Sequence, residues 1–118
     1  MRQPPAIDGY GGGGFRVAGV WRPGSLLILA DVPRDWRPAV MSDLALTDFE
    51  AVIAAPPGTV EFVLLGTGPS QSLPPRAVRD ALRVAGLGLE FMATEAAAKL
   101  HNVLASEGRL FATALIAI

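Results

Sequence analysis

Three long apolar runs constrain the fold of this chain more than any other feature of its sequence. They are Ser25–Ala30 (SLLILA), Val60–Leu65 (VEFVLL) and Leu110–Ile118 (LFATALIAI). A strand with one face in water alternates apolar and polar residues, whereas a strand buried on both faces has apolar residues at successive positions. The runs therefore predict buried central strands of one sheet in a layered α/β domain.

Helical patterns lie between the later runs. Pro74 and Pro75 suit the first turn of a helix, where a missing N–H is tolerated, and Gly86 suits its end. The apolar face of this helix comprises Val78, Ala81, Leu82 and Ala85. Another helix is expected to begin with Thr94 as its cap and to stop at Gly108. Its apolar face comprises Ala97, Leu100 and Leu104, and a strand through Leu87, Leu89 and Phe91 precedes it.

The middle of the chain has weaker signals. Thr47 and Glu50 have the spacing of a capping box, which predicts a short helix ending at about Ala55, before two prolines. Its apolar stripe comprises Phe49, Val52 and Ile53. The segment Asp31–Asp43 is expected to be a loop anchored by the Trp36 ring, because prolines interrupt it.

The N-terminal segment is rich in glycine. Consecutive glycines in Ile7–Gly14 predict a loop, and Phe15–Arg22, with Ala18-Gly19 at its centre, predicts a short β-hairpin. Gly9–Gly14 has the G-x-G-x-x-G spacing of a dinucleotide site, but that fingerprint needs a preceding strand and a following helix. Neither is expected here, so we expect the glycines to shape the backbone and no nucleotide cofactor to bind.

The order of elements favours one α/β domain. From Val60 onward strands alternate with helices, which predicts right-handed crossovers and a largely parallel sheet, with the hairpin on or beside it. A chain of 118 residues, 51% of them apolar, suffices for one core but hardly for two. We therefore expect a single domain over residues 1–118, of which residues 1–14 form a glycine-rich N-terminal segment.

Charge and cysteine content disfavour several classes of function. Ten basic and eleven acidic residues give a net charge of −1, too little to favour nucleic-acid binding. The absence of cysteine excludes disulfides, thiolate nucleophiles and cysteine-based metal sites. The first residues lack the apolar run of a secretory signal, and Leu110–Ile118 is about half of the ~20 residues that a membrane-spanning helix needs. A cytoplasmic protein without a membrane span is the expectation.

The loop from Gly66 to Ser72 is the candidate ligand site. It joins the carboxyl end of a predicted parallel strand to the start of a helix, where open α/β sheets place ligands and where backbone amides favour anions. Gly66 and Gly68 would let a ligand approach the backbone, while Thr67, Ser70 and Gln71 could form hydrogen bonds to it, with Thr94 reaching the same crevice. The alternative is an ordinary strand-to-helix connection, since the lysine of a phosphate-binding loop is absent.

No other group of residues predicts chemistry. His101 is the only histidine, and helical spacing places it at the edge of the apolar face, so we expect a half-buried structural role and no bound metal. Asn102 lies on the other side of that helix, either at an interface or in water. No catalytic residues and no cofactor are expected.

The chain as a whole resembles a known family. The similarity rests on Ile7–Tyr10 with the glycines and Phe15, on Gly24–Leu27, on Leu64–Gly68, and on Asn102–Leu104 with Glu107–Arg109, in that order. These segments are similar to the uncharacterised α/β domain family that includes the mitochondrial NADH:ubiquinone oxidoreductase (complex I) assembly factor three and the adipogenesis-associated domain protein. The resemblance implies a three-layer fold around a central mixed sheet, in proteins with no established enzymatic activity.

Two functional hypotheses follow, one from the resemblance and one from the candidate ligand site. The first is a non-enzymatic binding or assembly-factor-like module of bacterial type, with a protein partner of unknown identity and oligomerisation as an option. The alternative is a small-ligand or anion-binding domain, or an enzyme, that uses the crevice at Gly66–Ser72. A pocket with convergent polar groups beside Gly66 would favour the alternative, whereas an apolar surface patch would favour the binding module.

Overall fold

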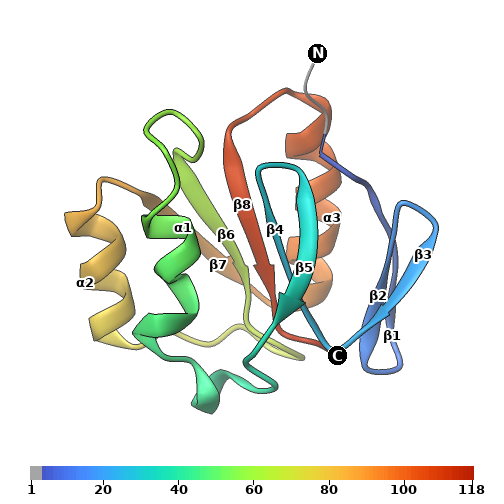
Figure 1. Cartoon of the computed structure of the whole chain (residues 1–118). Coiled ribbons are helices and arrows are strands. Elements are labelled where there is room, and N and C mark those ends of the chain that lie inside the picture. The colour runs from blue at the N-terminus through green and yellow to red at the C-terminus, as the bar shows by residue number, and fades with distance from the viewer. Residues whose placement is uncertain (1–3) are drawn as a thin grey trace.

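The apolar runs become neighbouring strands of one sheet. The computed structural model describes residues 4–118 and contains a five-stranded sheet in the order β5-β4-β8-β6-β7 (Figure 1). Its strands are β4 (Ser25–Leu29), β5 (Val32–Trp36), β6 (Phe62–Gly66), β7 (Gly88–Met92) and β8 (Phe111–Leu115). Strands β7 and β8 run parallel to β6, whereas β4 is antiparallel to β5 and β8. The sheet is therefore mixed, with as many antiparallel as parallel pairings, rather than largely parallel.

Successive side chains of the central strands enter two different cores. In β4, Leu27 and Leu29 belong to one core, and Leu26 and Ile28 belong to the other. Strands β6 and β8 alternate in the same way, with Val63, Leu65, Ala112 and Ala114 on the first side and Phe62, Leu64, Phe111 and Leu115 on the second. The prediction that these runs are buried on both faces is confirmed.

Each face of the sheet has its own covering layer (Figure 1). The first is covered by helices α1 (Glu50–Ile53) and α2 (Arg76–Val84), together with the short 3₁₀ turns η1 (Met41–Asp43) and η2 (Leu46–Phe49). The second is covered by α3 (Thr94–Ser106) and by a separate three-stranded sheet. As predicted, α2 begins directly after Pro75, and both later helices are followed by a glycine with positive φ, Gly86 at +77° and Gly108 at +70°.

The N-terminal sheet contains one strand more than the sequence predicts. It has the order β1-β2-β3, in which β2 (Gly14–Val17) and β3 (Val20–Pro23) form the predicted hairpin. The loop predicted for Ile7–Gly14 is wrong, because Ile7–Gly11 forms β1 and pairs with β2. Gly12 and Gly13, with φ of +64° and +85°, make the two-residue turn between them, a turn geometry that requires positive φ at both positions. A strand follows this turn, not the helix that a dinucleotide site needs.

The predicted loop between Asp31 and Asp43 is also partly wrong. Val32–Trp36 forms β5, which pairs only with β4 at the edge of the large sheet. Pro33 is tolerated there because an edge strand has one side on which no ladder hydrogen bond is needed.

The first helix starts differently from the prediction. A 3₁₀ turn, Leu46–Phe49, precedes the single α-helical turn of α1, so Thr47 and Glu50 do not form a capping box. Asp48 takes that role instead, since its Oδ2 accepts a hydrogen bond of 2.8 Å from the Ala45 amide.

Asn102 of α3 holds the start of the small sheet. Its Oδ1 accepts a hydrogen bond of 2.9 Å from the Ile7 amide, and its Nδ2 donates one of 2.8 Å to the Ile7 carbonyl. The side chain thus satisfies both backbone groups of one residue, as a neighbouring strand would. It ties the two elements that cover this face of the large sheet to each other.

We expect Asn102→Ala to lower the free energy of unfolding by about 1–3 kcal/mol, because it removes the partners of two backbone groups. Val103→Ala is the matched control: Val103 is the next residue of α3 and is 53% exposed, so its truncation should change stability by less than about 0.5 kcal/mol. Urea denaturation of both variants checks this, and an equal effect of the two substitutions would contradict the role assigned to Asn102.

Candidate functional site

The crevice predicted from the sequence lies where β6 and β7 end side by side. Gly66 of β6 is paired with Met92 of β7, and the chain continues from each strand toward a helix. The Thr67 amide donates a hydrogen bond of 2.8 Å to the Met92 carbonyl, which extends the contact by one residue. The structure therefore brings the loop after β6 and the start of α3 together, as the sequence predicted.

Thr67 closes the loop on itself. Its Oγ1 lies 2.7 Å from the Ser70 carbonyl oxygen and 3.1 Å from that of Met92, and it accepts a hydrogen bond of 3.1 Å from the Ser72 amide. The side chain is buried. Both the donor and the acceptor capacity of this hydroxyl are thus used within the protein.

Thr94 connects the same loop to β8. Its hydroxyl donates a hydrogen bond of 2.7 Å to the Ile116 carbonyl and accepts one of 2.9 Å from the Gly68 amide. Its own amide donates to the Gly68 carbonyl at 2.8 Å. The prediction that Thr94 caps the helix is wrong: α3 begins at Thr94 itself, after Ala93, and its hydroxyl is directed into the core.

The crevice is closely packed around these bonds. A Cβ atom on Gly66 would lie 2.8 Å from the Leu115 side chain and 3.0 Å from the Thr94 Cα, so Gly66 is required for the close approach of the elements. Ser70 and Gln71 are exposed, whereas the other predicted ligand-binding residues, Gly66, Thr67, Gly68 and Thr94, are buried. An anion site at this loop stays a prediction, and its ligand would compete with bonds that the protein already makes.

A larger hollow lies between α1 and α2. This α1–α2 groove has a volume of about 690 Å³. It is lined by Leu46, Glu50, Ile53 and Ala54 on one wall and by Asp80, Ala81, Val84 and Ala85 on the other. Val84 is 83% exposed, and Leu46 and Ile53 are also exposed although both are large and apolar. A second hollow of about 300 Å³ adjoins it and shares Ile53 and Ala85.

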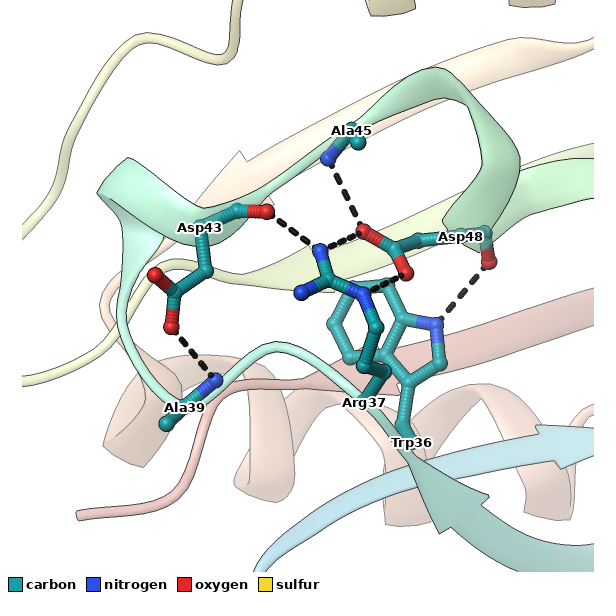
Figure 2. Close-up of polar contacts among 6 residues, drawn as sticks. All are labelled: Trp36, Arg37, Ala39, Asp43, Ala45 and Asp48. Carbon is teal, nitrogen blue, oxygen red and sulfur yellow. Dashed lines mark hydrogen bonds and ion pairs between the residues drawn. The ribbon is translucent and has the colours of Figure 1, made fainter.

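An ion pair holds the α1 wall of this groove. Arg37 is the first residue after β5, and Figure 2 shows its guanidinium between the Asp48 carboxylate and the Asp43 carbonyl. Arg37 donates from Nε to Asp48 Oδ1 at 2.8 Å and from Nη2 to Oδ2 at 2.7 Å, a bidentate geometry. The Trp36 indole donates to the Asp48 carbonyl at 3.0 Å, and Ala39 donates to the Asp43 carboxylate at 3.3 Å. These contacts bind η1 and η2 to the end of β5.

The electrostatics of this cluster follow from its geometry. The Asp48 side chain is only 4% exposed, but the hydrogen bonds from Arg37 hold the pKa of its carboxyl below the usual range despite the burial. The same contact raises the pKa of Arg37. Both groups therefore stay charged over the physiological range, and the cluster is a fixed structural unit rather than a source of protons.

His101 is more deeply buried than the sequence predicts. Its ring has no exposed surface, and it lies edge-on to Phe111 with 5.5 Å between the ring centroids. Nε2 lies 2.8 Å from the Pro5 carbonyl, so this nitrogen carries the proton, and Nδ1 accepts from the Thr113 hydroxyl at 2.7 Å. Burial lowers the pKa of His101 below its usual value, and the hydrogen bond to Pro5 offsets only part of that effect. The ring is a neutral connector between α3, β8 and the segment before β1.

Residues 4–118 have neither a metal-binding cluster nor a membrane-spanning helix. The described part of the chain contains no group of three His, Asp or Glu side chains that could hold a metal ion. Among residues 4–118, no helix is both long and apolar enough to cross a membrane.

Comparison with known proteins places the chain in a family. A family described as "Protein of unknown function (DUF498/DUF598)" matches residues 7–116. The chain belongs to this family. The resemblance noted in the sequence is confirmed, since a related mouse protein is NADH dehydrogenase [ubiquinone] 1 alpha subcomplex assembly factor 3. That protein is 31% identical over 111 residues, which cover 93% of this chain but only 59% of the mouse protein.

Some bacterial relatives are similar over more of their length than the mouse protein is. An uncharacterised protein of Rhodobacter capsulatus is 38% identical over 112 residues, which are 93% of this chain and 82% of that protein. Among solved structures, a protein from Bartonella henselae described as an outer membrane protein has a TM-score of 0.85 at 31% identity, covering 99% of this chain and 98% of its own. A Bordetella parapertussis protein has a TM-score of 0.86 at 26% identity, covering 98% of each chain. These structures share the fold over nearly its whole length.

The α1–α2 groove was not predicted from the sequence. Ile53 was placed on an apolar stripe with Phe49 and Val52, but only Phe49 and Val52 are buried. The sequence contained one signal for the groove. Val84 is the only large apolar residue of α2 that lies outside the apolar face predicted for this helix.

We expect Asp48→Ala to destabilise the protein by about 1–2 kcal/mol, since it removes the bidentate ion pair and the capping bond to Ala45. Asp35→Ala is the control, because Asp35 forms a single ion pair with Arg22 and its side chain is 87% exposed. Its truncation should cost less than about 0.5 kcal/mol, as is usual for surface ion pairs. Urea denaturation of the two variants measures the difference, and equal unfolding midpoints would contradict the structural role of Asp48.

The His101 ring should titrate below its usual pKa of 6.5 in the folded protein. Unfolded chains bind a proton at about 6.5 while the folded state stays neutral, so the free energy of unfolding should fall as pH drops from about 7.5 to about 5. Because the chain has one histidine, NMR titration of the ring protons reports this group alone. A ring pKa at or above 6.5 would show that the buried, neutral state is wrong.

Proposed function

We propose that this chain is a non-enzymatic protein-binding module with a role like that of an assembly factor, and that the α1–α2 groove is its contact surface. The observation that carries the proposal is the exposure of Leu46, Ile53 and Val84 along one apolar hollow. Contiguous exposed apolar surface on a folded domain is typical of protein–protein contact sites.

The groove has the features of a docking surface rather than of a catalytic centre. Only two of its lining residues, Glu50 and Asp80, are charged, and the rest are apolar; Glu50 is exposed and Asp80 is half-buried. A mainly apolar surface with few charged residues is typical of the centre of a protein interface. Val84 makes no contribution to the core, so its apolar character is best explained by a partner.

The family adds support of a different kind. The mouse relative is named as an assembly factor of an NADH dehydrogenase subcomplex. We extend the general character of that role, protein binding, to this chain, and leave the identity of the partner open.

Site-specific photo-crosslinking in cells tests the proposal. A photoreactive amino acid at position 84 should give discrete adducts with a protein, and the same residue at position 103 should not. Val103 is the matched control because it is also an exposed valine on a helix, but it lies on α3 in the opposite layer.

The partner must then be identified and its binding reproduced with two purified proteins. Val84→Glu should weaken that binding about tenfold or more, the effect expected when a charge enters an apolar contact. Absence of adducts at position 84, or equal labelling at position 103, would overturn the proposal.

A further inference from the structure

The two edges of the large sheet differ in how they are protected. Strand β5 forms one edge and β7 the other, since each has a single neighbour in the sheet (Figure 1). An edge strand presents backbone groups that can pair with another chain, and proline on the edge prevents this. In β5, Val32 follows a two-residue turn and its backbone groups face β4, so those of Pro33 face outward and include no donor. Strand β7 contains no proline and no bulge.

The pairing of β7 with β6 determines which of its backbone groups face outward. The Gly88 amide donates a hydrogen bond of 3.0 Å to the Glu61 carbonyl, and the Met92 carbonyl accepts one of 2.8 Å from the residue after β6. Both ends of β7 therefore face β6. Because the direction of the backbone groups alternates along a strand, the amides and carbonyls of Leu89 and Phe91 point away from the sheet. Two donors and two acceptors are available there at the spacing of an extended chain.

This β7 edge, formed by residues 88–92, lies at the surface. All five of its residues are exposed or half-buried, whereas every residue of β4, β6 and β8 is buried. The edge is also separate from the α1–α2 groove, because no residue of β7 lines that groove. The protein thus has a second surface with unused binding capacity, and this capacity lies in its backbone.

We propose that the β7 edge binds an extended segment of a different protein, which pairs with it as an additional antiparallel strand. Main-chain hydrogen bonds provide the affinity in this mode of peptide recognition, and the side chains beside them provide the specificity. The antiparallel direction is chosen because it is the more stable pairing per residue. This inference goes beyond the proposed function, since it concerns another surface and does not require the groove to be occupied.

The side chains of β7 specify the sequence of the added strand. Those of Leu89 and Phe91 pack against the core that α2 covers, whereas Glu90 is exposed and alternates to the other face of the sheet. Side chains that lie directly opposite each other on paired strands are in contact. The partner strand should therefore have Lys or Arg opposite Glu90 and apolar residues opposite Leu89 and Phe91, an apolar-basic-apolar pattern.

Glu90 also disfavours a second copy of this chain as the occupant. If Leu89 of one copy paired with Phe91 of another, the two Glu90 side chains would lie directly opposite each other. Like charges in that arrangement are destabilising, whereas opposite charges are stabilising. The central charge of β7 therefore favours a different protein with a basic residue over self-pairing.

NMR titration of the isotope-labelled chain with a synthetic peptide tests the pairing. The probe is the acetylated and amidated peptide Lys-Thr-Val-Lys-Val-Thr-Lys, whose central Val-Lys-Val has the expected pattern. It should bind with a dissociation constant of about 1 mM or lower. The amides of Leu89 and Phe91 should then exchange with solvent more slowly, because they become hydrogen-bonded to the peptide. The Gly88 amide should change little, since it is already bonded to Glu61.

Backbone methylation of the peptide separates strand pairing from side-chain contact. N-methylation of both Val residues removes the amides that donate to the Leu89 and Phe91 carbonyls, and should weaken binding about tenfold or more. N-methylation of the central Lys is the matched control. Its amide faces away from β7 in the same pairing, so this change should have little effect.

Charge reversal tests the predicted specificity. Glu90→Lys should weaken binding of the Lys-centred peptide and strengthen binding of the same peptide with Glu at its centre. Glu107→Lys is the control, because Glu107 is an exposed carboxylate at the end of α3 and should favour neither peptide. Val84→Glu, in the α1–α2 groove, should leave binding of both peptides unchanged. Circular dichroism checks that all three variants are folded.

The outcomes separate this inference from the proposed function. Absence of saturable binding at millimolar peptide, equal binding of the two methylated peptides, or protection confined to amides outside β7 overturns it. Protection of Leu89 and Phe91 that rises with protein concentration without peptide identifies a second copy as the occupant, so a different protein is wrong. If the peptide fails and position 84 still forms adducts, the role of the groove stands. If the peptide binds and position 84 forms none, the β7 edge stands and the role of the groove is wrong.

Discussion

Because β4, β6 and β8 are apolar on both faces, the central sheet is stable only when each face has its own covering layer. The two layers are built very differently. On one side lie α3, a helix of thirteen residues, and the three-stranded sheet, joined by the bonds of Asn102 to Ile7 and of His101 to Pro5. On the other side lie α2, with nine residues, and α1, with a single turn. The thinner layer covers the core but leaves the α1–α2 groove open on its outer side.

Short helices have little stability on their own, and in the thinner layer polar contacts stabilise the shortest one, α1. A single helical turn has too few backbone bonds to offset the cost of its nucleation. The bidentate contact of Arg37 with Asp48 fixes the segment before α1 to the end of β5. The Trp36 ring packs edge-on against Phe49, with 5.6 Å between the ring centroids. The wall of the groove is therefore positioned by contacts that lie outside the groove. A surface held in this way can bind a partner without first becoming ordered, which reduces the entropic cost of association.

The sequence predicted those elements whose signals are local. Continuous apolar runs located β4, β6 and β8, and Pro75, Gly86 and Gly108 marked the helix ends, because each residue acts on its own backbone. Strands β1 and β5 were missed because their stability comes from distant partners. Glycines in β1 and Pro33 in β5 disfavour a strand locally, yet the pairing of Gly9 with Arg16 and of β5 with β4 overrides that preference. The direction of β4 depends on which strands it pairs with, so the proportion of parallel pairings could not be read from the order of elements.

The site shows the same division between local signals and tertiary contacts. Connectivity correctly placed the Gly66–Ser72 loop beside Thr94, but spacing could not show that the hydroxyls of Thr67 and Thr94 bind carbonyl groups across the crevice. That difference matters for function. A ligand that enters this loop must break internal hydrogen bonds, and each buried group left unpaired costs about 1–3 kcal/mol. A protein that covers the α1–α2 groove displaces water mainly from apolar side chains, since six of the eight lining residues are apolar, and full burial of one Val or Leu contributes about 1.5–3 kcal/mol. The balance of these terms favours association at the helical surface over ligand binding at the end of the sheet, even though open α/β sheets more often use the latter.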